Sequence, residues 1–141
     1  MAVILVAEYN EQWQKVIRGQ LENRWGQQSV NVVGFYEEAL YMIQKHMIGE
    51  QPYEFYVIGD IKSESNELRD PTDSGLTIRL LDELTNKRRI SPDRIAVVSD
   101  NPFVQSEAQK RKNTQAYSRG IAGGKDLTRL IWDVGNRFAR R

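Results

Sequence analysis

The chain of 141 residues contains no cysteine and only one histidine. Without cysteine it has no disulfide, no thiolate metal site and no cysteine nucleophile. The single His46 has no second histidine to join it, so a zinc or haem site is not expected. We interpret His46 as a cation at a helix end or as a surface group.

A charge excess and a long apolar run are also missing. Twenty basic and nineteen acidic side chains leave a net charge of +1, so no overall field attracts nucleic acid, a membrane or an acidic substrate. Three basic clusters, 87–89, 110–112 and 137–141, are typical of solvated helix ends, and nucleic acid is not favoured. The apolar start, 1–7, is too short for a signal sequence, and no later stretch approaches a membrane span. We therefore expect a soluble, cytoplasmic protein.

Five short apolar runs alternate with five segments of helical periodicity, which is typical of an α/β domain with a parallel sheet. The apolar runs are 3–7, 30–35, 55–59, 95–99 and 114–118. Because strands buried on both faces are nearly continuous apolar runs, we predict a flavodoxin-like, doubly wound sheet of five parallel strands. Its predicted order is 2-1-3-4-5, with helices on both faces and right-handed crossovers. We expect one domain, 1–141, without an output domain.

The helical segments carry apolar residues three and four positions apart. Asn10 is placed to cap the first, and Asn101-Pro102 is suited to begin the fourth. The predicted helices are 11–25, 37–47, 76–87, 102–112 and 125–137. Trp13, Trp25 and Trp132 belong to the first and last of these, and we expect them in the core or at its edge.

One connection, 61–74, is long for a link between a strand and a helix. It is rich in Ser, Asp, Glu and Asn, and only Leu68 is available to anchor it. We therefore expect it to lie over the acidic pocket at the carboxyl ends of the strands, with little burial and high mobility.

Polar side chains follow four of the five predicted strands. In an open α/β sheet, ligands bind outside the carboxyl ends of the strands, where the strand order reverses. The residues at these ends are therefore the candidates for a functional site. They are Glu8 and Tyr9, Asp60, Ser99 and Asp100, and Ser118 and Arg119.

This set of residues, on this alternation of elements, resembles the receiver domain of bacterial response regulators over nearly the whole chain. In that family an acidic pair ends the first strand, a phosphoacceptor Asp the third, a Ser or Thr the fourth and a Lys the fifth. The corresponding residues here are Glu8-Tyr9, Asp60, Ser99 and Arg119. The resemblance implies that Asp60 is the phosphoacceptor and that the chain acts in two-component signalling.

The resemblance also implies a Mg²⁺ ion, held by the acidic pair, the acceptor and a backbone carbonyl. Here Glu8, Asp60 and the carbonyl of Lys62 would supply the oxygens. Tyr9 stands where the second acid is expected, and a neutral phenol is a poor ligand for Mg²⁺. We therefore expect only weak Mg²⁺ binding.

Two further departures from the family's pattern affect the acceptor. Arg119 has a planar fork that can hold the Asp60 carboxylate through two hydrogen bonds, as a Lys cannot. Asp100 adds charge beside Ser99 and would hinder a phosphoryl donor. Asp60 is therefore expected to be an impaired or vestigial phosphoacceptor, with Ser99, Arg119 and Tyr117 as the residues that contact a phosphoryl group or report its arrival.

We expect the chain to work by binding a protein and not as an enzyme. A histidine kinase or a phosphotransfer protein is the expected partner, and a homodimer stays open. The resemblance implies an output surface on the fourth helix, fifth strand and fifth helix, which here includes Lys110, Tyr117 and Arg119.

Two alternatives from other functional classes remain open. A flavin- or nucleotide-binding domain would need a phosphate cradle after the first strand, but the residues there include no Gly-rich loop, and Glu8 and Glu11 would repel phosphate. A metal-assisted phosphohydrolase would use the carboxylates of Glu8, Asp60 and Asp100.

Overall fold

The computed structural model describes residues 4–26, 30–49, 51–64, 74–111, 114–120 and 126–139. Within them the chain forms a five-stranded parallel sheet of order β2-β1-β3-β4-β5, which confirms the predicted α/β fold and strand order. Each described strand lies within its apolar run. The strands are β1 (Ile4–Ala7), β2 (Val30–Val33), β3 (Phe55–Ile58), β4 (Ile95–Val98) and β5 (Gln115–Tyr117).

Helices follow the strands in the predicted alternation. The side-chain oxygen of Asn10 accepts a hydrogen bond from the Trp13 N–H at 3.1 Å, and that of Asn101 accepts one from the Phe103 N–H at 2.9 Å, so both predicted caps are formed. The third predicted helix divides, since its last turn is a π-helical segment. The helical elements are α1 (Glu11–Trp25), α2 (Tyr36–Ile48), α3 (Ser74–Asp82), η2 (Glu83–Lys87), η3 (Pro92–Arg94), α4 (Pro102–Lys110) and α5 (Leu127–Ala139).

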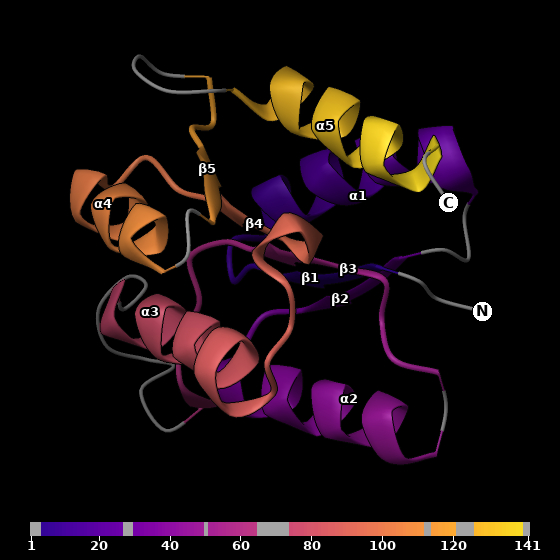
Figure 1. Cartoon of the computed structure of the whole chain (residues 1–141). Helices are drawn as coiled ribbons and strands as arrows, with labels where there is room; N and C mark the ends of the chain where they lie inside the picture. The colour runs from indigo at the N-terminus through magenta and orange to yellow at the C-terminus, as the bar shows by residue number, and fades with distance from the viewer. Residues whose placement is uncertain are drawn as a thin grey trace.

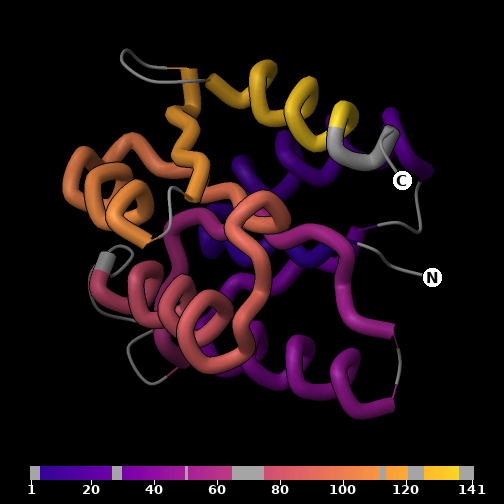
Figure 2. The backbone as a smooth tube through the Cα atoms, viewed as in Figure 1, coloured from indigo at the N-terminus to yellow at the C-terminus, as the bar shows by residue number. Residues whose placement is uncertain are grey.

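The sheet separates two apolar layers (Figure 1). Helices α1 and α5 cover one face, where Ile4 and Val6 of β1 point toward them. Helices α2, α3 and α4 cover the other face, where Leu5 and Ala7 contribute to the core. The alternation of neighbouring residues between the two layers is the two-residue period of a strand. Figure 2 shows α4 beside β5, at the edge of the sheet farthest from β2.

Two side chains of the helices lie where the sequence pattern did not place them. His46, expected to be a cation at a helix end or a surface group, lies in the last turn of α2 but is only 4% exposed, and its ring stacks on Tyr53 at 4.0 Å between centroids. Trp132, expected in or near the core, is 64% exposed. It lies two residues from both Leu130 and Val134, which face inward, and a two-residue step turns a helix by more than half a circle. The other two tryptophans, Trp13 and Trp25, pack against the core as expected.

The start of the long connection is buried, so the expectation of slight burial is wrong for it. Ile61, Lys62 and Ser63 are 0%, 7% and 8% exposed. Lys62 forms a parallel bridge with Phe35, which ties this segment to the beginning of α2. Residues 65–73, which hold Leu68 and most of the predicted mobile loop, lie outside the described residues.

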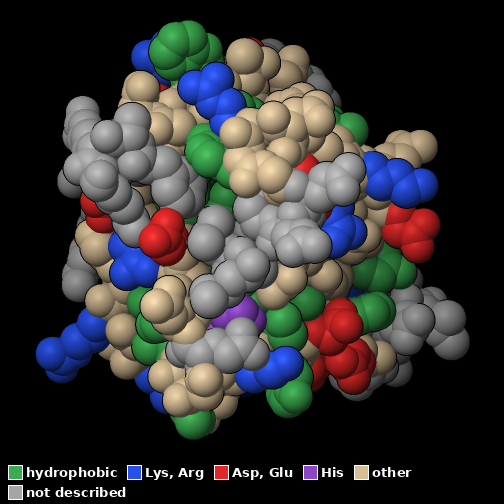
Figure 3. Space-filling model, turned by 90° about the vertical axis from the view of Figure 1, so that its right-hand side faces the viewer, with side chains coloured by type: hydrophobic (Ala, Val, Ile, Leu, Met, Phe, Trp, Pro, Cys, Tyr) green, Lys and Arg blue, Asp and Glu red, His purple; other side chains and the backbone are tan. Residues whose placement is uncertain are grey.

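The surface that lies at the right of Figure 1 faces the viewer in Figure 3. The described Lys and Arg side chains on this side are interspersed with Asp and Glu, and the described part of this face shows no continuous basic patch. No helix in the described ranges has both the length and the apolar character to cross a bilayer.

Candidate functional site

The four strands β1, β3, β4 and β5 lie side by side, and the residues that follow them meet at the carboxyl edge of the sheet. Glu8 follows β1, and Asp60 follows β3 after one glycine. Ser99 and Arg119 follow β4 and β5. Hydrogen bonds and ion pairs connect these four side chains, so four of the seven residues predicted at the strand ends lie together.

The Asp60 carboxylate is bound on both of its oxygens. The hydroxyl of Ser99 donates to Oδ1 at 3.0 Å. Nη2 of Arg119 lies 3.3 Å from Oδ2. The side chain is 22% exposed, so the carboxylate is still reached by solvent at the edge of the sheet. Both carboxylate oxygens of Asp60 therefore already have partners within the protein.

Glu8 is the fully buried carboxylate of the site. Its carboxylate accepts hydrogen bonds from the N–H of Asn10 at 2.9 Å and of Asp60 at 3.3 Å, and it forms an ion pair with Arg119. Burial raises the pKa of Glu8 to about 7, although the charge of Arg119 and the two backbone bonds act to lower it. Gly59 leaves the space that Glu8 fills, since a Cβ at that position would lie 2.3 Å from Oε1.

Arg119 connects the two acids. Its Nη2 contacts both Glu8 Oε1 and Asp60 Oδ2, and the side chain is 10% exposed. The pairing with Asp60 was expected, but the expected two-bond fork was not correct, because the same nitrogen spans both carboxylates. Within the described residues, the buried Nε of Arg119 has no hydrogen-bond partner.

Two contacts that the sequence did not predict hold Arg119 in place. The guanidinium lies over the ring of Trp13, with 4.9 Å from Cζ to the ring centroid. Oδ1 of Asp100 accepts a hydrogen bond from the backbone N–H of Arg119 at 2.8 Å. Asp100 is exposed and fixes the end of β5. The only signal in the sequence for the contact between Trp13 and Arg119 was that Trp13 lies in the first turn of the helix that follows β1.

Tyr9 belongs to an aromatic cluster at the end of β2. Its ring meets that of Phe35 edge-on at 5.6 Å, and the ammonium group of Lys62 lies 4.5 Å from its centroid. The carbonyl of Lys62, a candidate metal ligand, accepts a hydrogen bond from the Tyr36 N–H at 2.8 Å. That carbonyl thus has a backbone partner at the beginning of α2, which a metal ion would have to share.

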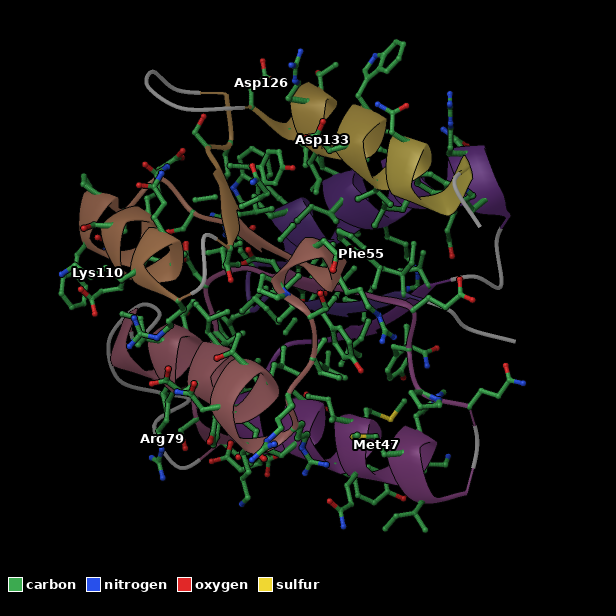
Figure 4. The ribbon with its side chains drawn as sticks, viewed as in Figure 1. Met47, Phe55, Arg79, Lys110, Asp126 and Asp133 are labelled. Atoms are coloured by element: carbon green, nitrogen blue, oxygen red, sulfur yellow. The ribbon has the colours of Figure 1, made fainter. Side chains whose placement is uncertain are left out.

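Tyr117 does not belong to an exposed surface, which corrects the sequence-based expectation. It is 0% exposed and packs in the layer beneath α1 and α5. Its hydroxyl donates to Oδ2 of Asp133 at 2.6 Å, and Figure 4 shows Asp133 on α5. Tyr117, the last residue of β5, fills the core because its strand position faces the helices, and the bond to Asp133 satisfies its hydroxyl.

The residues do not fit a divalent metal ion. Two carboxylates face each other, but a guanidinium nitrogen contacts both. The Lys62 carbonyl is bonded to a backbone N–H, and Tyr9 packs on Phe35. No group of three or more His, Asp or Glu side chains suited to a metal occurs in the described ranges. Mg²⁺ needs several oxygen ligands in an open octahedral arrangement, and this site offers no such set.

No family model matches the chain, and no curated protein matches it in sequence. Its fold, in contrast, matches solved structures. The receiver domain of Francisella response regulator 1452 is 19% identical with a TM-score of 0.65, and the match covers 97% of this chain and 96% of that one. The chain has the fold of a receiver domain.

Other structures with this receiver fold agree. A CheY-like receiver domain protein from Methanospirillum hungatei JF-1 is 11% identical with a TM-score of 0.62, covering 99% of this chain and 95% of that one. NtrX from Brucella abortus, solved with ADP, is 18% identical with a TM-score of 0.64 over 97% of this chain, which corresponds to 26% of NtrX. At these identities the receiver fold is shared, and the chemistry must be argued from this chain's own residues.

Proposed function

We propose that this chain is an atypical receiver that signals by binding a protein partner, with Asp60 as an impaired phosphoacceptor. The supporting observation is the set of contacts on Asp60. A hydroxyl from the end of β4 and a cation from the end of β5 both bind its carboxylate, in a chain with the receiver fold. A hydroxyl and a cation beside the acceptor are two of the groups that stabilise a phosphoryl group during its transfer to a carboxylate.

The same contacts explain the impairment. In the transfer, an Asp60 oxygen forms a bond to phosphorus while the bond from phosphorus to the donor's leaving atom breaks, and the leaving group departs with its electron pair. The phosphoryl oxygens must be met by positive charge as this happens. Arg119 is engaged by Glu8 as well as by Asp60, so it has to be drawn away from a buried carboxylate before it can meet the phosphoryl group.

Surface features favour α4 as the site of partner binding. Phe103 and Lys110 are seven residues apart on α4 and therefore share one side of the helix, which we call the α4 face. Phe103 is 55% exposed, and the Lys110 side chain is 69% exposed and projects outward in Figure 4. An exposed aromatic two turns from a cation, which also pairs with Glu107, suits a protein surface with apolar and acidic groups, such as a histidine kinase or a phosphotransfer protein.

The two alternatives gain no support from the site. The carboxylates of a phosphohydrolase do not converge, because Asp100 is exposed and caps the backbone of Arg119. A flavin or nucleotide phosphate would meet the N-terminus of α1, where the Asn10 side chain already accepts from the Trp13 N–H and Glu11 adds negative charge.

Incubation with acetyl phosphate and Mg²⁺ tests the acceptor, with the intact mass as the readout. We expect slow, incomplete addition of one phosphoryl group to the native chain, faster addition to Arg119→Lys, and none to Asp60→Asn. A mass gain that persists in Asp60→Asn, or no gain in either the native chain or Arg119→Lys, would contradict the assignment of Asp60.

The binding role is tested separately. Phosphotransfer from a purified histidine kinase tests the α4 face, with Phe103→Ala as the variant and Tyr41→Ala, on α2 in the same helix layer, as the control. Tyr41 is 65% exposed on α2, so its removal samples an exposed aromatic elsewhere. Equal losses of phosphotransfer in the two variants would argue against the α4 face. Sedimentation at rising protein concentration shows whether the partner is a second copy of this chain.

A further inference from the structure

The space between the two acids of the site already contains a positive charge. Nη2 of Arg119 contacts Oε1 of Glu8 and lies 3.3 Å from Oδ2 of Asp60. A metal ion that bridged these carboxylates would have to stand where this nitrogen stands. Because two like charges cannot share that position, the guanidinium and a divalent ion are mutually exclusive there.

The guanidinium is held from several sides. Trp13 packs against it, and Asp100 fixes the backbone from which it extends. Its main partner, Glu8, is itself fixed by the N–H groups of Asn10 and Asp60. An incoming Mg²⁺ would therefore have to lose part of its hydration shell and also displace a buried, paired cation.

Tyr9, which the sequence suggested as the cause of weak metal binding, has a different place. Its ring packs edge-on against Phe35 and beneath the Lys62 ammonium, in a cluster at the end of β2. A carboxylate introduced at residue 9 would meet the positive charge of Lys62 and leave the Arg119 contacts as they are. Restoring an acid at this position would thus leave the bridging position occupied.

From these contacts we propose that the Arg119 guanidinium is the resident cation of the site, and that Arg119, more than the replacement of an acid by Tyr9, keeps divalent metal ions out. Two carboxylates and one guanidinium leave the group with one net negative charge, whereas the carboxylates alone carry two when both are ionised. This inference goes beyond the proposed signalling role and needs neither a phosphoryl donor nor a protein partner.

Binding of Mn²⁺ to the full chain, measured by water-proton relaxation and electron paramagnetic resonance, tests it. The variants are Arg119→Met, which keeps an unbranched apolar stem and removes the charged guanidinium, Tyr9→Asp, and the two combined. Arg129→Met is the control, because Arg129 is 66% exposed on α5 and its removal takes away one positive charge at a distance from the site. All are compared at a pH above the pKa of Glu8, which is about 7.

We expect Arg119→Met to bind Mn²⁺ at least about tenfold more tightly than the native chain, a change that corresponds to one decade in Kd. Tyr9→Asp and Arg129→Met should stay close to the native chain, and the combined variant should bind most tightly. Adding Glu8→Gln to Arg119→Met should abolish the gain, which assigns the bound ion to this site.

Tight Mn²⁺ binding by the native chain would overturn the proposal, and so would a gain in Tyr9→Asp without one in Arg119→Met. If Arg119→Met does not fold, as circular dichroism would show, Arg119→Lys takes its place. Its shorter, single-point ammonium should yield to Mn²⁺ more readily than the native fork, and equal binding by the two would overturn the proposal. Failure of acetyl phosphate labelling affects only the proposed function, since the Mn²⁺ measurement does not use Asp60 as a nucleophile.

Discussion

Two arginines of this chain each stand between two carboxylates, in very different surroundings. Arg119 joins Glu8 and Asp60 at the edge of the sheet, with side chains that are 10%, 0% and 22% exposed. Arg111 joins Asp82 of α3 to Glu107 of α4, with side chains that are 20%, 40% and 21% exposed. The chemistry of the two groups is the same, so their differences are due to burial.

Those differences are visible in the protonation of the acids. Around Arg111, hydrogen bonds from Lys110 and Arg111 lower the pKa of Glu107, and the bond to Asp82 raises the pKa of Arg111. Around Arg119, burial raises the pKa of Glu8 to about 7 even though the same kind of cation lies beside it. A surface ion pair stabilises its charges, whereas a buried one must first offset the loss of hydration.

The largest expected difference between the two groups is the loss of stability when each arginine is removed. Above about pH 8, we expect Arg119→Met to lower the free energy of unfolding by about 3 kcal/mol or more, because it leaves the buried Glu8 charge without its cation. Arg111→Met should cost about 1 kcal/mol or less. Urea unfolding followed by tryptophan fluorescence measures both, and equal costs would show that the burial difference has no energetic consequence.

The pH dependence of stability should have opposite signs in the two groups. The pKa of Glu8 is raised from 4.5 to about 7 by folding, so the folded chain binds more protons between these values and the contribution of Glu8 to stability is lost as pH rises. Its size is up to about 3 kcal/mol. The lowered pKa of Glu107 acts the other way, and its contribution is lost as pH falls below 4.5.

Urea midpoints between about pH 3 and pH 8 test this, since the range includes the ordinary carboxyl pKa values of about 4 and that of Glu8. Replacing Glu8 by Gln should remove the loss of stability with rising pH, and Glu107→Gln should leave it unchanged. A loss of the same size in Glu8→Gln as in the native chain would assign it to another group.

Adding a methyl group should lower the free energy of unfolding at Gly59, beside the buried Glu8, and raise it at Gly19, on α1. Gly59→Ala would bring Cβ to 2.3 Å from Glu8 Oε1, so the buried ion pair must shift, at a cost of about 1 to 3 kcal/mol. Gly19→Ala is the matched control in α1, where a Cβ meets nothing within 4 Å. It should stabilise the chain by roughly 0.5 to 1 kcal/mol through helix propensity. Thermal unfolding of both variants would reveal any deviation from these opposite signs.

Salt should give the smallest effect. At roughly 1 M NaCl the Debye length is about 3 Å, so the partly exposed contacts of Arg111 should weaken by a few tenths of a kcal/mol. The contacts of Arg119 should change less, because solvent ions do not reach Glu8. The quantity to compare is the cost of Arg111→Met and of Arg119→Met at low and high salt. A larger salt effect for Arg119 would mean that its site is open to solvent.

Much of the fold was predictable because it depends on local patterns. Strands buried between two helical layers are apolar throughout, so β1, β3 and β4 were recognised directly. Asn10 and Asn101 marked the starts of two helices because their side chains accept from the backbone. Trp132 and His46 were misplaced, since one has a large apolar ring on an outward helix position and the other a polar ring on an inward one.

The candidate site was predictable in composition but not in its contacts. Parallel strands end at the same edge, so Glu8, Asp60, Ser99 and Arg119 were expected together. The expected partner of Arg119 was Asp60 alone, and the pairing with Glu8 was missed. Nothing in the sequence distance between residues 8 and 119 indicates that Glu8 becomes fully buried and needs a cation.

By itself, the sequence determined the order of the elements, the strand ends that carry polar groups and the absence of cysteine chemistry, because these follow from periodicity and composition. Only the tertiary structure decided which of these polar groups form ion pairs with one another. The burial of Glu8, the stacking of Arg119 on Trp13 and the inward position of Tyr117 each depend on how β1, β5, α1 and α5 pack together. Burial and distance set the strength of an ion pair, and both are properties of the folded chain.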